Sequence, residues 1–125
     1  MDISDETFSN LISRAIDELP RRYIENLDNV AITYADEPTP EQLKKQGVRE
    51  GESLLGLYEG IPRTQRGAGY TLVLPDKITI FKRPLLMLST GEIDLYRRVK
   101  HTLWHEIAHH YGLNHADMDK LENKQ

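Results

Sequence analysis

The sequence predicts an α+β domain, with a helix near each end of the chain and short strands between them. Apolar residues recur at helical spacing near the N-terminus and after residue 89, whereas the apolar runs between these segments are short and separated by Gly and Pro. A chain of 125 residues is long enough to bury roughly two-thirds of its unfolded surface. Because no repeat, linker or low-complexity tract interrupts it, we expect residues 1–125 to form a single domain.

The first helix is predicted to begin just after Ser4, a residue type that is favoured at the N-cap position. Ile3 and Phe8 flank this position as the two members of a hydrophobic staple. From Phe8 to Leu19 the apolar residues keep helical spacing, and Pro20 then ends the run. The resulting apolar stripe is typical of a helix that packs on a domain core.

The middle of the chain is predicted to contain one short helix and several strands. Thr39 can cap the short helix, which extends to Gln46. Segment 60–69 is rich in Gly and Pro and is expected to form a surface loop. Apolar runs that are typical of strands occupy residues 29–34, 54–58, 70–74 and 78–81.

A long helix is predicted to follow, running to about Tyr111. Ser89 and Glu92 have the spacing of a capping box and would mark its start. Its helical wheel has two distinct faces. The face expected to pack on the sheet carries Tyr96, Val99, Leu103 and Ile107, flanked by Trp104 and Ala108. The opposite, polar face carries Arg98, Thr102, His105 and His109.

Composition excludes several classes of protein. The net charge is −4, and the Lys and Arg residues are scattered along the chain, which argues against a nucleic-acid or membrane-surface partner. No apolar run is long enough to span a bilayer, and the polar residues 1–6 do not resemble a signal peptide. The chain has no Cys, which agrees with a reducing compartment. We therefore expect a cytoplasmic protein, whose oligomeric state the sequence does not indicate.

Residues 105–115 match the zinc-peptidase pattern H-E-x-x-H-x-x-G-x-x-H at every fixed position. His105 and His109 are four residues apart, so a helix places them on one face. A continuous helix would carry His115 about 9 Å further along its axis and onto another face. Gly112 tolerates the left-handed conformation that ends a helix with a sharp turn. The pattern therefore predicts one metal ion bound by His105, His109 and His115.

The residue types indicate a catalytic zinc site. Three imidazoles leave one coordination position open, whereas a structural site would be closed by four protein ligands. The absence of Cys excludes a thiolate-bound structural zinc. Glu106 is expected to lie beside the two helical ligands, where a carboxylate can act as a general base without binding the metal. We therefore expect one Zn²⁺ per chain, with Glu106 as the catalytic residue.

Several segments resemble a known family. The motif at 105–115 is the specific part of the resemblance, and residues 15–20, 54–62 and 74–80 are also similar. Together they resemble the small bacterial zincin-like metallopeptidases, sometimes called minimal zincins. The resemblance implies an α+β, zincin-like fold, in which a small mixed β-sheet packs against an N-terminal helix and a long active-site helix. It also implies a metalloprotease-like zinc site on His105, His109 and a third-ligand position that is Asp or His in the family and is His115 here.

The function expected from these observations is that of a zinc metalloendopeptidase, a hydrolase that cleaves peptide bonds in a peptide or protein substrate. An extended substrate would pair with a strand edge, at residues 54–58 or 78–81. One alternative is a non-catalytic zinc- or peptide-binding protein of the same fold. Another is a zinc-dependent endoribonuclease, because some of these enzymes space three His residues in the same way. Glu106 and the acidic composition argue against the second alternative.

A few further residues have both a functional and a structural interpretation. His101 precedes His105 by one helical turn and would either contact the site or be a plain exposed histidine. His110 lies toward the packed side of the helix and is expected to be a hydrogen-bonded structural residue. Tyr70 and Tyr111 would serve as oxyanion donors or as half-buried aromatic residues. Full-size metzincins have a Met-turn, which places a Met beneath the metal some way after the third His. Met118 follows His115 by only three residues, so a packing role is at least as good an interpretation.

Overall fold

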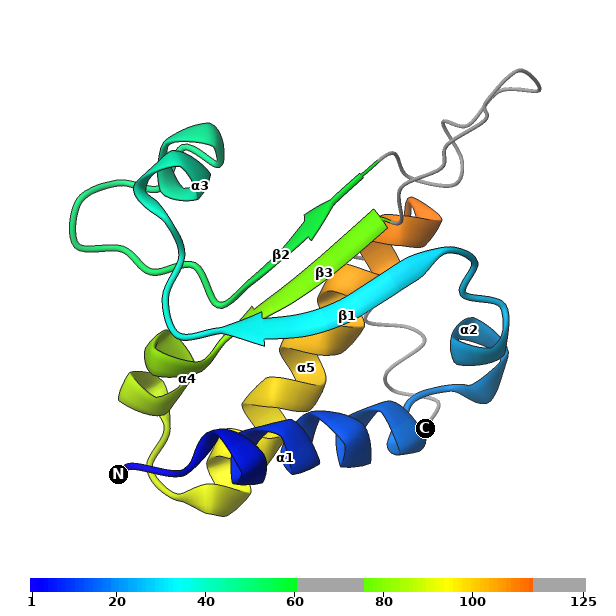
Figure 1. Ribbon diagram of the computed structural model, residues 1–125, viewed down its shortest axis with the longest axis horizontal. Helices are drawn as coiled ribbons and strands as arrows, with labels where there is room; N and C mark the ends of the chain where they lie inside the picture. The colour runs from blue at the N-terminus through cyan, green and yellow to red at the C-terminus, as the bar shows by residue number, and fades with distance from the viewer. Residues whose placement is uncertain (61–75, 114–125) are drawn as a thin grey trace.

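The computed structural model describes residues 1–60 and 76–113, in which three strands lie between helices near the two ends of the described chain (Figure 1). His115, Met118, Tyr70 and the strand expected at 70–74 lie outside the described residues. The helices are α1 (Asp5–Glu18), α2 (Arg21–Glu25), α3 (Pro40–Lys45), α4 (Lys82–Leu88) and α5 (Glu92–Tyr111). The strands are β1 (Val30–Ala35), β2 (Gly56–Glu59) and β3 (Asp76–Phe81).

The three described strands form one mixed sheet in the order β1-β3-β2. β1 runs parallel to β3, with Val30 opposite Asp76 and Ala35 opposite Phe81. β2 runs antiparallel to β3, with Gly56 opposite Ile80. β3 is therefore the central strand, and β1 and β2 are the edges of the described sheet. The expectation of a small mixed sheet is confirmed.

The core lies between one face of the sheet and the two long helices. In β3, Ile78 and Ile80 are fully buried, as are Val99 and Leu103 of α5. α5 packs against β2, β3 and α1, and Figure 1 shows it behind the strands with α1 alongside. Phe8 of α1 completes this core. The sheet and α1 thus hold α5 from two directions, which fixes the position of its polar face.

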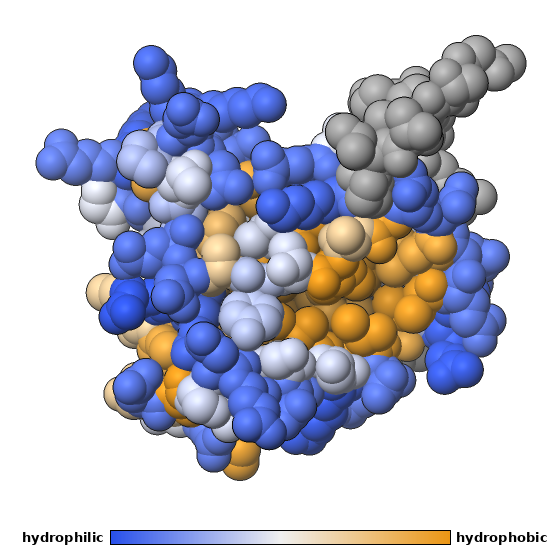
Figure 2. Space-filling view, viewed as in Figure 1, coloured by the Kyte–Doolittle hydropathy of each residue, from blue (hydrophilic) through white to orange (hydrophobic). Residues whose placement is uncertain are grey.

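The edge strand β1 borders an apolar surface. Figure 2 shows hydrophobic side chains gathered below β1, between this strand and the helices α1 and α2. The partly buried apolar residues of these three elements are Leu11, Ile16, Tyr23, Ile24, Val30, Ile32 and Tyr34.

Within residues 1–60 and 76–113, no helix combines the length and the apolar character needed to cross a membrane.

The predicted start of α1 is confirmed. Ser4 has extended backbone angles, and its hydroxyl accepts a hydrogen bond from the backbone N–H of Thr7 at 3.1 Å. The Thr39 hydroxyl likewise accepts a hydrogen bond from the backbone N–H of Gln42 at the start of α3. The backbone N–H of Thr39 donates to Oε1 of Gln42, which completes a capping box. Both starts follow from local chemistry that the sequence shows directly.

The capping box expected at the start of α5 is wrong. The N-cap residue is Gly91, and no side chain caps it. The Ser89 hydroxyl instead donates to the carbonyl of Leu85 at 2.7 Å, because Ser89 ends α4. α4 itself follows β3 directly and was not among the expected elements. The backbone N–H of Thr90 donates to the carboxylate of Asp94 at 3.0 Å, so an acid two residues beyond Glu92 supports this turn.

The strands lie close to their expected positions, with one shift. β1 and β3 cover residues 29–34 and 78–81 almost completely. β2 begins only at Gly56, so Leu54 and Leu55 lead into the strand instead of forming part of it. This shift matters for the site, because the lead-in residues line the hollow described below.

Candidate metal centre

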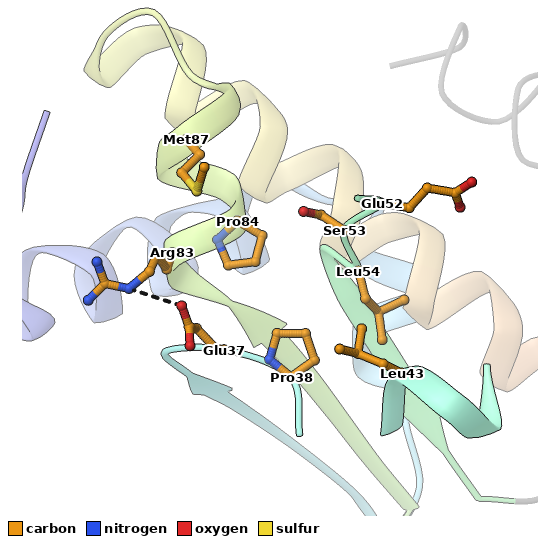
Figure 3. Close-up of a pocket in the computed structure, with 9 residues that line it drawn as sticks. All are labelled: Glu37, Pro38, Leu43, Glu52, Ser53, Leu54, Arg83, Pro84 and Met87. Carbon is orange, nitrogen blue, oxygen red and sulfur yellow. Dashed lines mark ion pairs between the residues drawn. The ribbon is translucent and has the colours of Figure 1, made fainter. Parts of the chain in front are cut away.

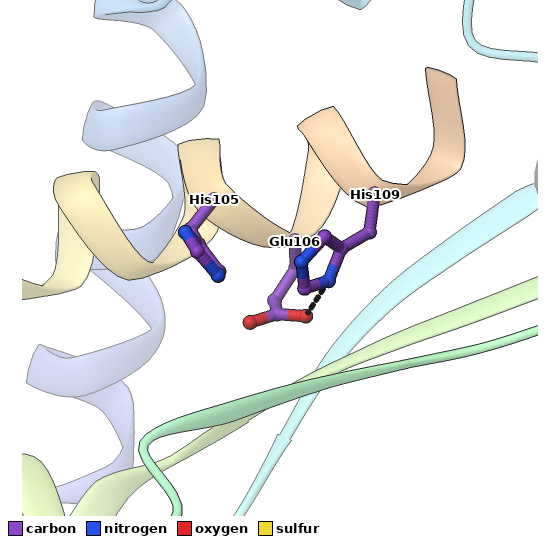
Figure 4. Close-up of side chains that lie close together, drawn as sticks. All are labelled: His105, Glu106 and His109. Carbon is purple, nitrogen blue, oxygen red and sulfur yellow. Dashed lines mark hydrogen bonds and ion pairs between the residues drawn. The ribbon is translucent and has the colours of Figure 1, made fainter. Parts of the chain in front are cut away.

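α5 brings His105, Glu106 and His109 together on the side of the helix that faces the sheet (Figure 4). The expectation that the two histidines lie on the face away from the sheet is therefore wrong, because Gly56 lets β2 approach this face of α5. A ligand atom from each of the three side chains lies within 4.8 Å of the others. The centroids of the His105 and His109 rings are 4.5 Å apart, and the ring planes are inclined by 69°. The four-residue spacing therefore produces the expected pair of imidazoles, with a carboxylate between them.

Glu106 is buried, with a relative exposure of 6%. Its Oε1 lies 3.0 Å from Nδ1 of His109. The hydrogen bond to Glu106 raises the pKa of His109, and partial burial of the imidazole opposes the shift. Because Nδ1 of His109 contacts this carboxylate, Nε2 is the ring nitrogen that would bind a metal ion. Glu106 thus orients one imidazole and stays next to the space where a ligand would bind.

Gly56 of β2 permits a close approach between the sheet and α5. A Cβ atom built on Gly56 would lie 2.6 Å from Cγ2 of Thr102 and 3.3 Å from Cγ of Glu106. Thr102 is buried by this contact, although the helical wheel placed it on the polar face. Gly56 is a site residue that the sequence interpretation missed. The available signal was a glycine inside an apolar strand, which often marks a close backbone approach.

A hollow of about 260 Å³ opens where β2 meets α5. Its lining combines the lead-in to β2 with one face of α5: Leu54, Leu55, Gly56, His101, Thr102, His105 and Glu106. His101 is exposed at its rim, and its ring centroid is 6.5 Å from that of His105. His105 and Glu106, the first two residues of the motif, therefore face a hollow that is bordered by the edge strand β2.

A separate hollow of about 190 Å³ lies between α3 and α4 (Figure 3). An ion pair of 3.4 Å joins Arg83 and Glu37 at its border. The residues that line it are Glu37, Pro38, Leu43, Glu52, Ser53, Leu54, Arg83, Pro84 and Met87. It contains no residue of the motif, so the candidate site is the hollow beside β2.

α5 ends as the motif requires. Gly112 is the C-cap residue and has a φ of 72°, in the left-handed region. Its backbone N–H donates to the carbonyl of His109 at 3.0 Å, and the N–H of Leu113 donates to the carbonyl of Ala108 at 3.0 Å. The chain therefore turns away from the helix axis at Gly112. The third expected ligand, His115, lies beyond the described residues.

A comparison with known protein families identifies the family of the chain. A model of the family described as zincin-like metallopeptidase matches residues 27–125, which include the whole motif. The chain belongs to the zincin-like metallopeptidase family. Its α+β fold, with a small mixed sheet and a long motif helix, is the zincin-like fold expected from the sequence.

A solved structure shares this zincin-like fold. It is a conserved hypothetical protein from Thermus thermophilus, with a TM-score of 0.56 and 23% sequence identity. The match covers 98% of this chain and 100% of the other. At this identity the similarity concerns the fold alone. No curated protein matches the chain.

The residues of this zincin-like chain fit a zinc ion. Two imidazoles and a nearby carboxylate are donors that suit Zn²⁺, and the family implies the same metal. The two histidines are partly exposed, and His105 also lines the hollow, so a metal ion has access to the pair.

Behind the site, a buried polar cluster fixes the end of α5. His110 is fully buried, and its Nδ1 lies 3.4 Å from Oδ2 of Asp76 in β3. Tyr58 of β2 donates its hydroxyl to the same carboxylate oxygen at 2.6 Å. The full burial of His110 and its contact with Asp76 favour the structural interpretation of this residue. Tyr111 donates its hydroxyl to the carbonyl of Tyr23 at 2.6 Å, which favours its packing role over that of an oxyanion donor.

Proposed function

We propose that the chain is a zinc-dependent metalloendopeptidase. The observation that carries the proposal is the cluster of His105, Glu106 and His109, in a chain of the zincin-like metallopeptidase family. The first two of these residues line a hollow beside an edge strand. In this proposal His105, His109 and His115 bind one zinc ion. A bound zinc ion would supply Lewis acidity toward the scissile carbonyl and toward a water molecule.

Glu106 is the proposed general base. Its buried carboxylate would accept a proton from the attacking water and later deliver it to the amine that leaves. The bond to Nδ1 of His109 holds one carboxylate oxygen in place, and a carboxylate has a second oxygen for the proton transfer. His109 therefore has two roles in the proposal: it binds the metal, and it orients the base.

β2 is the strand edge proposed to bind the substrate. β3 pairs with β1 on one side and with β2 on the other, so residues 78–81 have no unpaired edge to offer. β2 borders the described sheet next to the hollow, and Gly56 brings its backbone close to Glu106. An extended peptide on this edge would be bound through main-chain hydrogen bonds, which select for an extended backbone more than for one sequence.

The test is cleavage of a diverse peptide mixture by zinc-loaded protein, with the products identified by mass spectrometry. We expect cuts with the wild type and none with Glu106→Ala. Glu92→Ala is the matched control, because Glu92 is an exposed glutamate at the other end of the same helix. The zinc content of each protein is measured in parallel. A protein that holds zinc and cuts nothing would refute the proposal in favour of a non-catalytic zinc- or peptide-binding protein, and cleavage of RNA would favour the endoribonuclease.

A further inference from the structure

The hollow at the motif continues along α5 toward the start of the helix. A second hollow of about 340 Å³ is lined by Leu55, Asp94, Arg97, Arg98, His101 and Thr102. It shares Leu55, His101 and Thr102 with the hollow that contains His105 and Glu106. The two hollows therefore form one groove, here called the α5 groove, between α5 and the lead-in to β2.

The far end of the α5 groove lies within reach of a bound peptide. Arg98 precedes His105 by seven positions, which corresponds to about 10 Å along a helix. An extended peptide advances by about 3.3 Å per residue. A substrate whose scissile bond lies at His105 and Glu106 would therefore bring a residue about three positions away beside Arg98.

Two arginines and one aspartate set the charge at this end. Arg98 donates from Nε to Oδ2 of Asp94 at 3.1 Å, and Nη2 of Arg97 lies 3.4 Å from Oδ1 of the same carboxylate. The backbone N–H of Thr90 and then Arg98 lower the pKa of Asp94, which keeps it ionised at neutral pH. One carboxylate thus faces two guanidinium groups. The end of the groove has a local excess of positive charge in a protein whose net charge is −4.

The two guanidinium groups are accessible to a ligand. The side-chain exposure is 41% for Arg98 and 75% for Arg97, against 16% for Asp94. Each guanidinium has five N–H donors in a planar fork that suits carboxylates. Asp94 forms ion pairs with both arginines. These ion pairs restrict the two side chains in advance, which lowers the entropy that ligand binding would cost.

We propose that Arg97 and Arg98 form a specificity subsite for a carboxylate of the substrate, about three residues from the scissile bond. This inference rests on the proposed peptidase function. The carboxylate is either an Asp or Glu side chain or the free C-terminus of a short peptide. A peptide that runs antiparallel to β2 would place this carboxylate on the C-terminal side of the scissile bond, because Leu55 precedes Gly56 at this end of the groove.

The test measures binding separately from cleavage. Zinc-loaded Glu106→Ala protein is titrated into fluorescein-labelled decapeptides of one neutral sequence, in which a single Glu is moved through each position, and the change in fluorescence anisotropy is followed. Peptides with Gln at the same positions, and with a free or an amidated C-terminus, distinguish the two sources of the carboxylate. For a partly exposed ion pair we expect Glu to bind roughly two- to fivefold more tightly than Gln at one position.

Substitutions then assign this preference to the subsite. Adding Arg98→Gln should reduce the Glu-to-Gln ratio to about one, and Arg98→Lys should retain part of it. Arg97→Gln provides a second, more exposed substitution if the first lowers stability. Arg21→Gln is the matched control, because Arg21 is also in a helical i,i+4 ion pair, in α2. It should leave the ratio unchanged.

The outcomes separate this inference from the proposed function. An equal affinity for Glu and Gln at every position, with either C-terminus, would overturn the inference, as would a preference that survives both arginine substitutions. Wild-type cleavage with no such preference would leave the peptidase proposal intact. A preference that depends on Arg98, in a protein that cuts no peptide, would support the subsite and refute the peptidase proposal.

Discussion

Replacing Gly56 with Ala tests how tightly β2 and the motif helix are packed together. The added Cβ would lie 2.6 Å from Cγ2 of Thr102, well inside an ordinary van der Waals contact, and 3.3 Å from Cγ of Glu106. Overpacking of this kind costs about 1–3 kcal/mol. The lower entropy of Ala in the unfolded chain returns about 0.4–1 kcal/mol. The free energy of unfolding should therefore fall by about 1–2 kcal/mol in Gly56→Ala.

Thr102→Ser supplies the matching change, because it removes the methyl group that the added Cβ would meet. In the wild-type background it should cost about 0.8 kcal/mol for one buried methyl group. In the Gly56→Ala background the new methyl group fills that space, so the double variant should be close to the wild type. The two substitutions should therefore be coupled by about 2 kcal/mol, within the range for residues in contact.

Urea unfolding of the wild type, the two single variants and the double variant measures this coupling. The slope of the free energy of unfolding against urea concentration should be the same for all four. Zinc affinity by chelator competition shows whether the motif remains assembled. Two results would refute the reasoning: a Gly56→Ala protein as stable as the wild type, or a double variant whose loss equals the sum of the single losses. Either result would mean that β2 is not held against α5 as closely as the structure shows.

Three more substitutions have defined outcomes. Ser4→Ala should lower the free energy of unfolding by about 1 kcal/mol, measured by urea unfolding, because the N-cap bond of α1 is lost. Gly60→Ala should cost about 3 kcal/mol or more by the same assay, since Gly60 has a φ of 155° and its Cβ would overlap the side chain of Asp76. Tyr96→Phe should raise the pKa of Glu18, followed by NMR, because the Tyr96 hydroxyl is the main cause of its lowered value. The wild-type stabilisation from Glu18 is present above the unfolded pKa and is lost as the pH falls through the lower folded value, so the variant should show a smaller loss in acid.

The parts of the fold that depend on neighbouring residues could be predicted from the sequence. Ser4 and Thr39 each contact a backbone N–H three residues away, and Gly112 ends α5 through its own left-handed conformation. The pairing of His105 with His109 likewise follows from helical geometry alone. Such features need no information about the rest of the chain.

The features that failed or were left open depend on contacts between distant segments. Ser89 has the spacing of a cap for α5, but its hydroxyl bonds to the end of α4 instead. The helix α4 was not expected, because the apolar run 85–88 shows no helical periodicity. Two strands were equal candidates for the substrate edge until strand order made β3 central. Gly56 became a site residue only when β2 was placed against Thr102. The position of His115 stays a prediction.

The central position of β3 also determines when the domain can assemble during synthesis. β1 finds its partner only at Asp76–Phe81, and β2 pairs with the same strand, so the described sheet cannot form until that segment has left the ribosome. Pairing between such distant segments is slow compared with helix formation. α5 follows later still, so the nascent chain exposes two unpaired strands before it has any of the motif. The proposed active site would therefore be absent from every shorter intermediate and would appear only with the nearly finished domain.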